Sequence, residues 1–204
     1  GFDYQTKDII KDELQQLVCC SPTATQIILV TPCVGTPLWE KLSADGRLIE
    51  KREHDYKLHD GFTSLFIHPW IVPGELEELQ RELYSIEYEL LGPSIFRVLY
   101  TQFQGYKNLK DDENTILRER AEAFLRNLKR ARIFYKLGID CAPNDSVRER
   151  LRRQYTEITD EIGDLNVPSG LTRYFLHPLV WWTRLRFKHN LFVQPRYQKR
   201  TYNI

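Results

Sequence analysis

The sequence has no methionine and no long apolar run. Its longest apolar stretches, at Gln26–Val30 and Leu179–Trp182, are far shorter than the roughly 20 residues that a membrane-spanning helix needs. The start of the chain also lacks the pattern of a signal peptide, in which a basic start and an apolar stretch precede a cleavage site. We therefore expect a cytoplasmic protein.

Cysteine is scarce and unpatterned. Cys19 and Cys20 are adjacent, whereas Cys33 and Cys141 are isolated, and no spacing resembles a disulfide ladder or a zinc knuckle. We expect these thiols to be buried. A Ser/His/Asp pattern, a glycine-rich phosphate loop and a dinucleotide-binding fingerprint are also missing, so the motifs offer no support for these common chemistries.

Acidic residues are absent from the last 38 residues, which contain seven Lys and Arg and eight aromatic side chains. Residues 1–166 contain 22 basic and 28 acidic side chains, a formal charge of −6. This basic aromatic tail, residues 167–204, has three interpretations: it packs on the acidic remainder, lies on an anionic membrane surface, or binds RNA. Nucleic acid is the least favoured partner. The residues for membrane contact are Trp181, Trp182, Arg184, Arg186 and Lys188.

The first 72 residues show an alternation that is typical of α/β proteins. Thr6 is placed to cap a helix, and the apolar, β-branched run Gln26–Val30 predicts a strand covered on both faces, as in a parallel sheet. Thr36 and Pro37 predict the start of a short helix. The segment "FTSLFIHPW" predicts a third strand, which begins near Phe62 and ends before Pro69.

From Pro73 onward the apolar residues recur at helical spacing. The expected helices cover residues 76–90, 94–104, 113–137 and 147–162. Gly92 and Gly138 are the expected stops. These patterns divide the chain into residues 1–72, a helical domain over 73–166, and the tail, residues 167–204.

The predicted sheet is incomplete. Two parallel strands joined by a helix do not form a stable sheet alone, because the apolar strand needs cover on both faces and its edges carry unpaired backbone groups. We therefore expect this chain to be the C-terminal portion of a longer protein that supplies the missing strands.

Three segments together resemble the end of the catalytic barrel of radical S-adenosylmethionine (SAM) enzymes, in particular the cobalamin-binding subgroup. They are "GFDYQT", "TPCVGTPLWEKLSADGRL" and "HDGFTSLFIHPW", the last followed by a Glu- and Leu-rich helix and "LGPS". The similarity covers about residues 1–135.

The resemblance implies an α/β fold: the C-terminal strands of a partial (β/α) TIM-like barrel, near residues 1–3 and 26–31, followed by a mainly α-helical domain. It implies SAM, an iron–sulfur cluster and cobalamin as cofactors of the parent protein. The family's cluster-binding cysteine motif is absent, and the four cysteines here cannot replace it. The upstream barrel and the cobalamin domain of the same polypeptide are therefore the implied partners.

Ligands in such barrels lie beyond the carboxyl ends of the strands. The resemblance therefore implies a SAM site lined by Gly1, Asp3, Gln5, Thr31, Pro32 and Gly35. Ordinary strand-to-helix turns need the same residue types, so spacing alone favours a purely structural role. The catalytic residues stay unknown.

Other polar residues have structural readings that outweigh functional ones. His54, His59 and His68 lack a helical metal-ligand spacing, so structural or exposed roles are favoured over a metal site. Glu53, Asp55 and Asp60 belong to a charged connecting loop.

The sequence therefore predicts the C-terminal portion of a radical SAM enzyme, one that methylates or rearranges an unactivated carbon and in which this chain completes the barrel and shapes the SAM and substrate side. The alternative is a non-catalytic helical interaction module with a basic aromatic tail that contacts a membrane or RNA.

Overall fold

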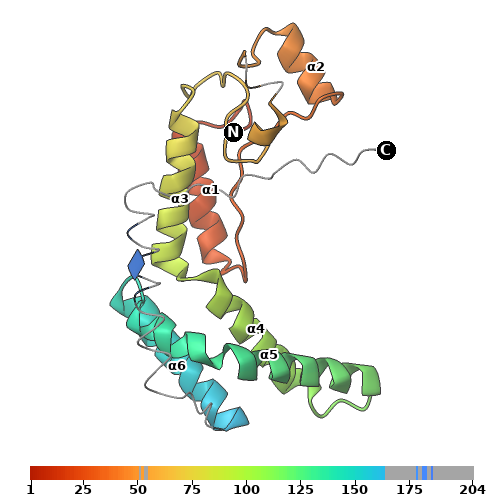
Figure 1. Cartoon of the computed structure of the whole chain (residues 1–204), viewed down its shortest axis with the longest axis vertical. Helices are drawn as coiled ribbons and strands as arrows, with labels where there is room; N and C mark the ends of the chain where they lie inside the picture. Colours follow the sequence, from red (N-terminus) through yellow and green to blue (C-terminus); the bar gives the residue numbers. More distant parts are fainter. Residues whose placement is uncertain (51, 53–54, 164–177, 179–180, 183–184, 186–204) are drawn as a thin grey trace.

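The computed structural model describes residues 1–50, 52, 55–163, 178, 181, 182 and 185. These residues form an elongated, bent molecule made mostly of helices (Figure 1). The helices are α1 (Lys7–Cys19), α2 (Pro37–Ala44), the 3-10 helix η1 (Tyr56–Leu58), α3 (Glu75–Leu91), α4 (Ser94–Leu109), α5 (Thr115–Asp140) and α6 (Asp145–Ile162).

The predicted α/β barrel is wrong. Within the described ranges, β pairing is limited to one isolated antiparallel bridge between Leu48 and Phe66, and neither residues 1–3 nor 26–31 form a strand. Gln26–Val30 instead runs as an extended trace back along α1 (Figure 1). Its apolar composition fits a strand, but no neighbouring strand lies in the described part of the chain, and side chains of α3 hold the segment instead.

Helix starts follow the predicted caps. Thr6 accepts a hydrogen bond from the Ile9 N–H at the start of α1, and Thr36 does the same for Trp39 at the start of α2, with Pro37 in the first helical position. A side-chain oxygen at this position satisfies an N–H that has no partner inside the helix. Both predictions are confirmed.

The later helices exist where the apolar period predicts them, with different ends. Helix α3 stops at Gly92, whose φ of +70° suits glycine. Helix α4 continues to Leu109 and α5 to Asp140, so the predicted stop at Gly138 is wrong. Gly138 lies inside α5. A Cβ at this position would come within 2.2 Å of the Phe96 ring on α4, so only glycine fits there. Close helix packing, and not a turn, explains this glycine.

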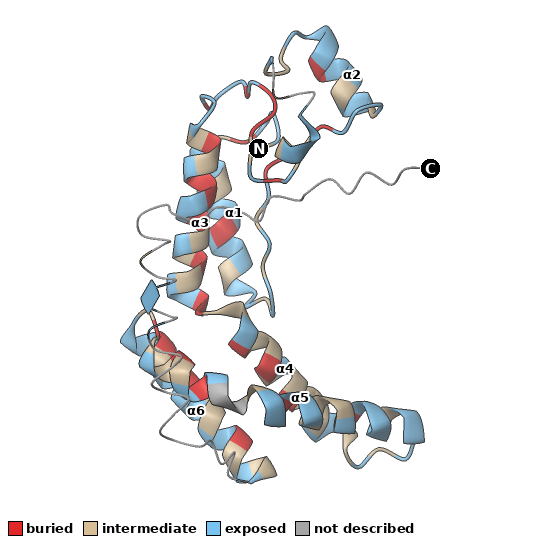
Figure 2. Cartoon of the chain, in the orientation of Figure 1, coloured by how far each residue is buried: buried red, intermediate tan, exposed pale blue. Residues whose placement is uncertain are grey.

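Two apolar clusters form the core (Figure 2). One joins α1, α3 and the extended segment, and its buried members are Leu14, Leu29, Ile71, Leu76, Leu79 and Leu83. The other joins α4, α5 and α6 around Phe103, Tyr135 and Ile158. Because α3 shares its core with α1, packing runs across the predicted boundary at residue 72.

Polar contacts fasten these two parts together at the end of α3. The buried Glu87 carboxylate pairs with Arg97, which also donates to the Gly92 carbonyl and to Thr23 and Thr25. Asn144, at the start of α6, donates to the Glu89 carbonyl over 2.8 Å. A charge buried to this degree is tolerable because it is paired and hydrogen-bonded.

Among the helices that the structure describes, none combines the length and the apolar character that crossing a bilayer would require. Cys19, Cys20 and Cys33 are exposed and Cys141 is half-buried, so the prediction of buried thiols is wrong. These three cysteines lie at the end of α1 and in a turn, where no apolar core covers them.

Candidate functional site

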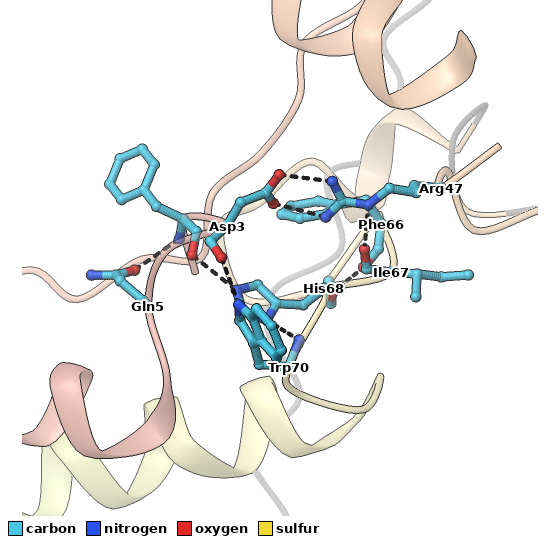
Figure 3. Close-up of polar contacts among 9 residues, drawn as sticks. Asp3, Gln5, Arg47, Phe66, Ile67, His68 and Trp70 are labelled. Carbon is cyan, nitrogen blue, oxygen red and sulfur yellow. Dashed lines mark hydrogen bonds and ion pairs between the residues drawn. The ribbon is translucent and has the colours of Figure 1, made fainter. Parts of the chain in front are cut away.

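Three of the segments that carry the family resemblance meet at one end of the molecule. Asp3 comes from "GFDYQT", Arg47 from "ADGRL", and His68 and Trp70 from "FIHPW". We call Asp3, Gln5, Arg47, His68 and Trp70 the N-terminal cluster. Figure 3 shows Arg47 against the Asp3 carboxylate, His68 and Trp70 against the backbone of the opening residues, and Gln5 to one side.

The Arg47 guanidinium holds Asp3 with two bonds. Nη1 donates to Oδ2 over 2.8 Å and Nη2 donates to Oδ1 over 2.7 Å, while Nε donates to the Ile67 carbonyl over 2.9 Å. This hydrogen bonding lowers the pKa of the Asp3 carboxyl and raises that of Arg47. The guanidinium also lies over the Phe66 ring at 5.7 Å from its centroid. A paired, planar contact of this kind fixes geometry as well as charge.

His68 and Trp70 bind the backbone of the opening residues. His68 is buried, with Nε2 2.9 Å from the Phe2 carbonyl and Nδ1 accepting from the Trp70 N–H over 3.2 Å. Because Nδ1 accepts and a carbonyl only accepts, the proton must lie on Nε2. The Trp70 indole Nε1–H donates to the Asp3 carbonyl over 2.9 Å. His68 therefore has a structural role here, as predicted.

Gln5 closes the turn at the start of the chain. Its Oε1 accepts from the Gly1 amino group over 2.7 Å and from the Phe2 N–H over 2.8 Å, and its Nε2 donates to Glu13. The polar atoms of Asp3 and Gln5 are thus engaged inside the protein.

The other predicted SAM residues lie in a separate turn before α2. The Thr31 hydroxyl donates to the Leu29 carbonyl, Pro32 is buried, and Gly35 has a φ of +80°. The hydrogen bonds of Thr31, to the Leu29 carbonyl and from the Cys33 thiol, are local to this turn. The SAM site at these six residues stays a prediction. Their hydrogen bonds are made to neighbouring parts of the protein and stabilise its turns.

Sequence reasoning missed Arg47, His68 and Trp70 as partners of the opening residues Phe2 and Asp3. Asp3 and Arg47 are 44 positions apart, and no periodicity links residues at such a separation. The available signal was that each of the three lies within a segment that resembles the family.

A metal ion or iron–sulfur cluster does not fit the described part of the chain. No group of three or more His, Cys, Asp or Glu side chains lies close enough there to hold a metal. His54 and Glu53 lie outside the described residues. Asp55 and Asp60 accept backbone N–H groups of their own loop, which agrees with the structural reading.

An open, mostly apolar groove lies between α4 and α5, beside Thr101, Gln102 and Phe124. Among the residues that the structure describes, Arg120 is the only titratable one in this lining, and an arginine stays charged at ordinary pH.

The described part of the tail is small. Trp181 and Trp182 are helical, with 64% and 53% of their surface exposed. Arg184, Arg186 and Lys188 lie outside the described residues, and the membrane contact stays a prediction.

Comparison of the chain with models of protein families, with curated proteins and with solved structures finds no match. The resemblance to radical SAM enzymes therefore stays a prediction from the sequence motifs.

Proposed function

We propose that this chain is the helical C-terminal part of a radical SAM enzyme of the cobalamin-binding subgroup. This chain contributes no barrel strands, because residues 1–3 and 26–31 do not form strands. It assigns to the chain the shaping of the SAM and substrate side, in a cytoplasmic enzyme that methylates or rearranges an unactivated carbon.

The N-terminal cluster is the observation that supports the proposal. Segments that resemble the family at three distant places in the sequence are joined by side chains that lie within those segments. If the likeness of the three segments to the family arose by chance, the segments would have no reason to meet in one hydrogen-bonded unit. A structural role that the three segments share would explain why they meet.

The cluster's contacts indicate what that task is. Arg47, His68 and Trp70 bind the side chain of Asp3 and the carbonyls of Phe2 and Asp3, so they set the path of the chain as it enters α1. We assign them as positioning residues, which orient the opening segment toward the catalytic part of the polypeptide.

The iron–sulfur cluster, SAM and cobalamin would be bound chiefly by that catalytic part, since the described residues here fit no metal. Radical chemistry belongs to those cofactors. This chain's own contribution is limited to orientation and to exclusion of solvent.

Anaerobic reconstitution with iron and sulfide tests the proposal. We expect the polypeptide that contains this chain to take up an iron–sulfur cluster, measured as iron and sulfide per chain and by visible absorption. Residues 1–204 alone are the matched control and should take up none. A full polypeptide that binds no cluster would contradict the proposal.

A helical interaction module that contacts an anionic membrane is the second candidate, and the exposed Trp181 and Trp182 favour it. Aromatic side chains beside basic ones suit the headgroup region of a bilayer. Flotation with vesicles containing phosphatidylserine should carry the protein upward, and deletion of residues 171–200 should abolish this. Equal flotation of both proteins would exclude the tail as the anchor.

A further inference from the structure

The extended segment Gln26–Val30 has one occupied edge and one open edge. On the occupied edge, the Ile27 N–H donates to the Tyr84 hydroxyl over 2.9 Å, and the Leu29 N–H donates to the Gly61 carbonyl over 2.8 Å. Gln80 Nε2 donates to the Ile27 carbonyl over 2.8 Å. The backbone groups of Ile27 and the N–H of Leu29 thus have hydrogen-bond partners on α3 and at Gly61.

The residues between them face the other way. In an extended chain, successive N–H and C=O groups point to opposite sides, so those of Ile28 and Val30 point away from Tyr84 and Gly61. Among the described residues, neither Ile28 nor Val30 has a backbone hydrogen-bond partner. Their groups repeat about every 7 Å, the spacing that another extended backbone matches.

Within Gln26–Val30, no charged side chain and no proline protects this edge against pairing. Ile28 is 55% exposed, and no charged residue occurs from Ser21 to Trp39, although 28% of the whole chain is charged. Natural proteins commonly block open edges with charged side chains, especially lysine, or with proline. This one is open, apolar and uncharged.

We propose that the open edge of Gln26–Val30 binds the same edge of a second copy of the chain, in an antiparallel pair centred on Ile28. A two-fold axis at Ile28 sets this residue opposite its own copy and sets Gln26 and Ile27 opposite Val30 and Leu29 of the other copy. All of these positions are uncharged, so no like charges meet in the pair. The two Ile28 side chains would meet at the centre and lose their exposure.

Sedimentation velocity of residues 1–204 over a wide concentration series tests the pairing. We expect a reversible monomer–dimer equilibrium. Ile28→Lys and Ile28→Glu should each weaken the dimer by about tenfold or more, since like charges at an interface centre repel. An equimolar mixture of the two variants should restore association. Ile95→Lys is the matched control, because Ile95 is 54% exposed on α4, and it should leave the equilibrium unchanged.

Amide hydrogen exchange gives a second readout. Exchange at Ile28 and Val30 should slow as concentration rises, while exchange at Ile27 and Leu29 should stay constant. A protein that is monomeric at every concentration, that forms open-ended polymers, or whose association ignores Ile28→Lys would overturn the proposal. A monomer would instead assign this edge to another segment of the parent polypeptide.

Discussion

Asp3 and Arg47 carry much of the geometry of the N-terminal cluster, and their coupling is measurable. The pair is partly exposed, with side-chain exposures of 46% and 20%, so water screens its charge and the coupling should be about 1 kcal/mol or less. A double-mutant cycle of Asp3→Asn and Arg47→Gln, measured by urea unfolding, should give this value. Purely additive single effects would show that the pair adds nothing to stability.

The same pair predicts an acid-dependent change. The pKa of Asp3 is lowered chiefly by its hydrogen bonds to Arg47, so the stabilisation is present above the ordinary carboxyl pKa and is lost as pH falls through the lowered one. The indole N–H resonance of Trp70, bonded to the Asp3 carbonyl, should shift in that acidic range. The Asp3→Asn protein should show no such step.

Tyr135 predicts a loss of folding stability at alkaline pH, whereas the Asp3–Arg47 pair predicts a loss at acidic pH. Burial raises the pKa of its phenol above the ordinary value of 10.0. The unfolded chain therefore releases this proton first, and folding stability falls as pH rises above about 10. Tyr135→Phe should reduce that fall in urea unfolding, whereas Tyr56→Phe, at a 68% exposed position, should leave it unchanged. Equal curves for Tyr135→Phe and the unaltered protein would contradict the burial argument.

At the scale of the helix, two asparagine caps differ in the number of helices that they contact. Asn144 caps α6 by accepting from the Val147 N–H over 3.0 Å and also donates to the Glu89 carbonyl of α3. Asn114 caps α5 with a bond to the Ile116 N–H over 2.9 Å. Loss of a cap costs about 1 kcal/mol, and Asn144→Ala should cost more because it also removes the contact to α3. Thermal unfolding of the two alanine variants compares them, and a larger loss for Asn114→Ala would refute this ranking.

The packing of α4 on α5 depends on Gly138. Alanine usually stabilises a helix relative to glycine by about 1 kcal/mol, but here its Cβ would come within 2.2 Å of the Phe96 ring. Overpacking of that kind costs about 1–3 kcal/mol, so Gly138→Ala should lower the melting temperature. Adding Phe96→Leu should recover part of the loss; no recovery would mean that the ring is not the obstacle.

Local signals predicted the helices because helices form from contacts between residues close in sequence. Thr6, Thr36 and Gly92 marked ends that the structure confirms. Strand formation at Gln26–Val30 was predicted wrongly because a strand needs a neighbour, and composition does not reveal whether one is present. The Asp3–Arg47 contact was out of reach for the same reason, since it joins residues 44 positions apart.

At the scale of the whole molecule, two helical parts meet at the end of α3, and the N-terminal cluster lies with α1 and α3 at the other end (Figure 1). Arg97, paired with Glu87, connects Thr23 and Thr25, just before the extended segment, to the junction between α3 and α4. In the proposed function, the end of the molecule that carries the N-terminal cluster faces the catalytic part of the polypeptide. Helices α4, α5 and α6 lie at the end away from that catalytic part.

Cleavage of SAM by the reconstituted polypeptide that contains this chain tests the central claim most directly. We predict cleavage by the unaltered protein, and a large reduction in Arg47→Ala at unchanged iron content. Arg81→Ala, at an exposed position on α3, should cleave SAM normally. No cleavage by the unaltered, cluster-loaded protein, or equal cleavage in both variants, would contradict the account.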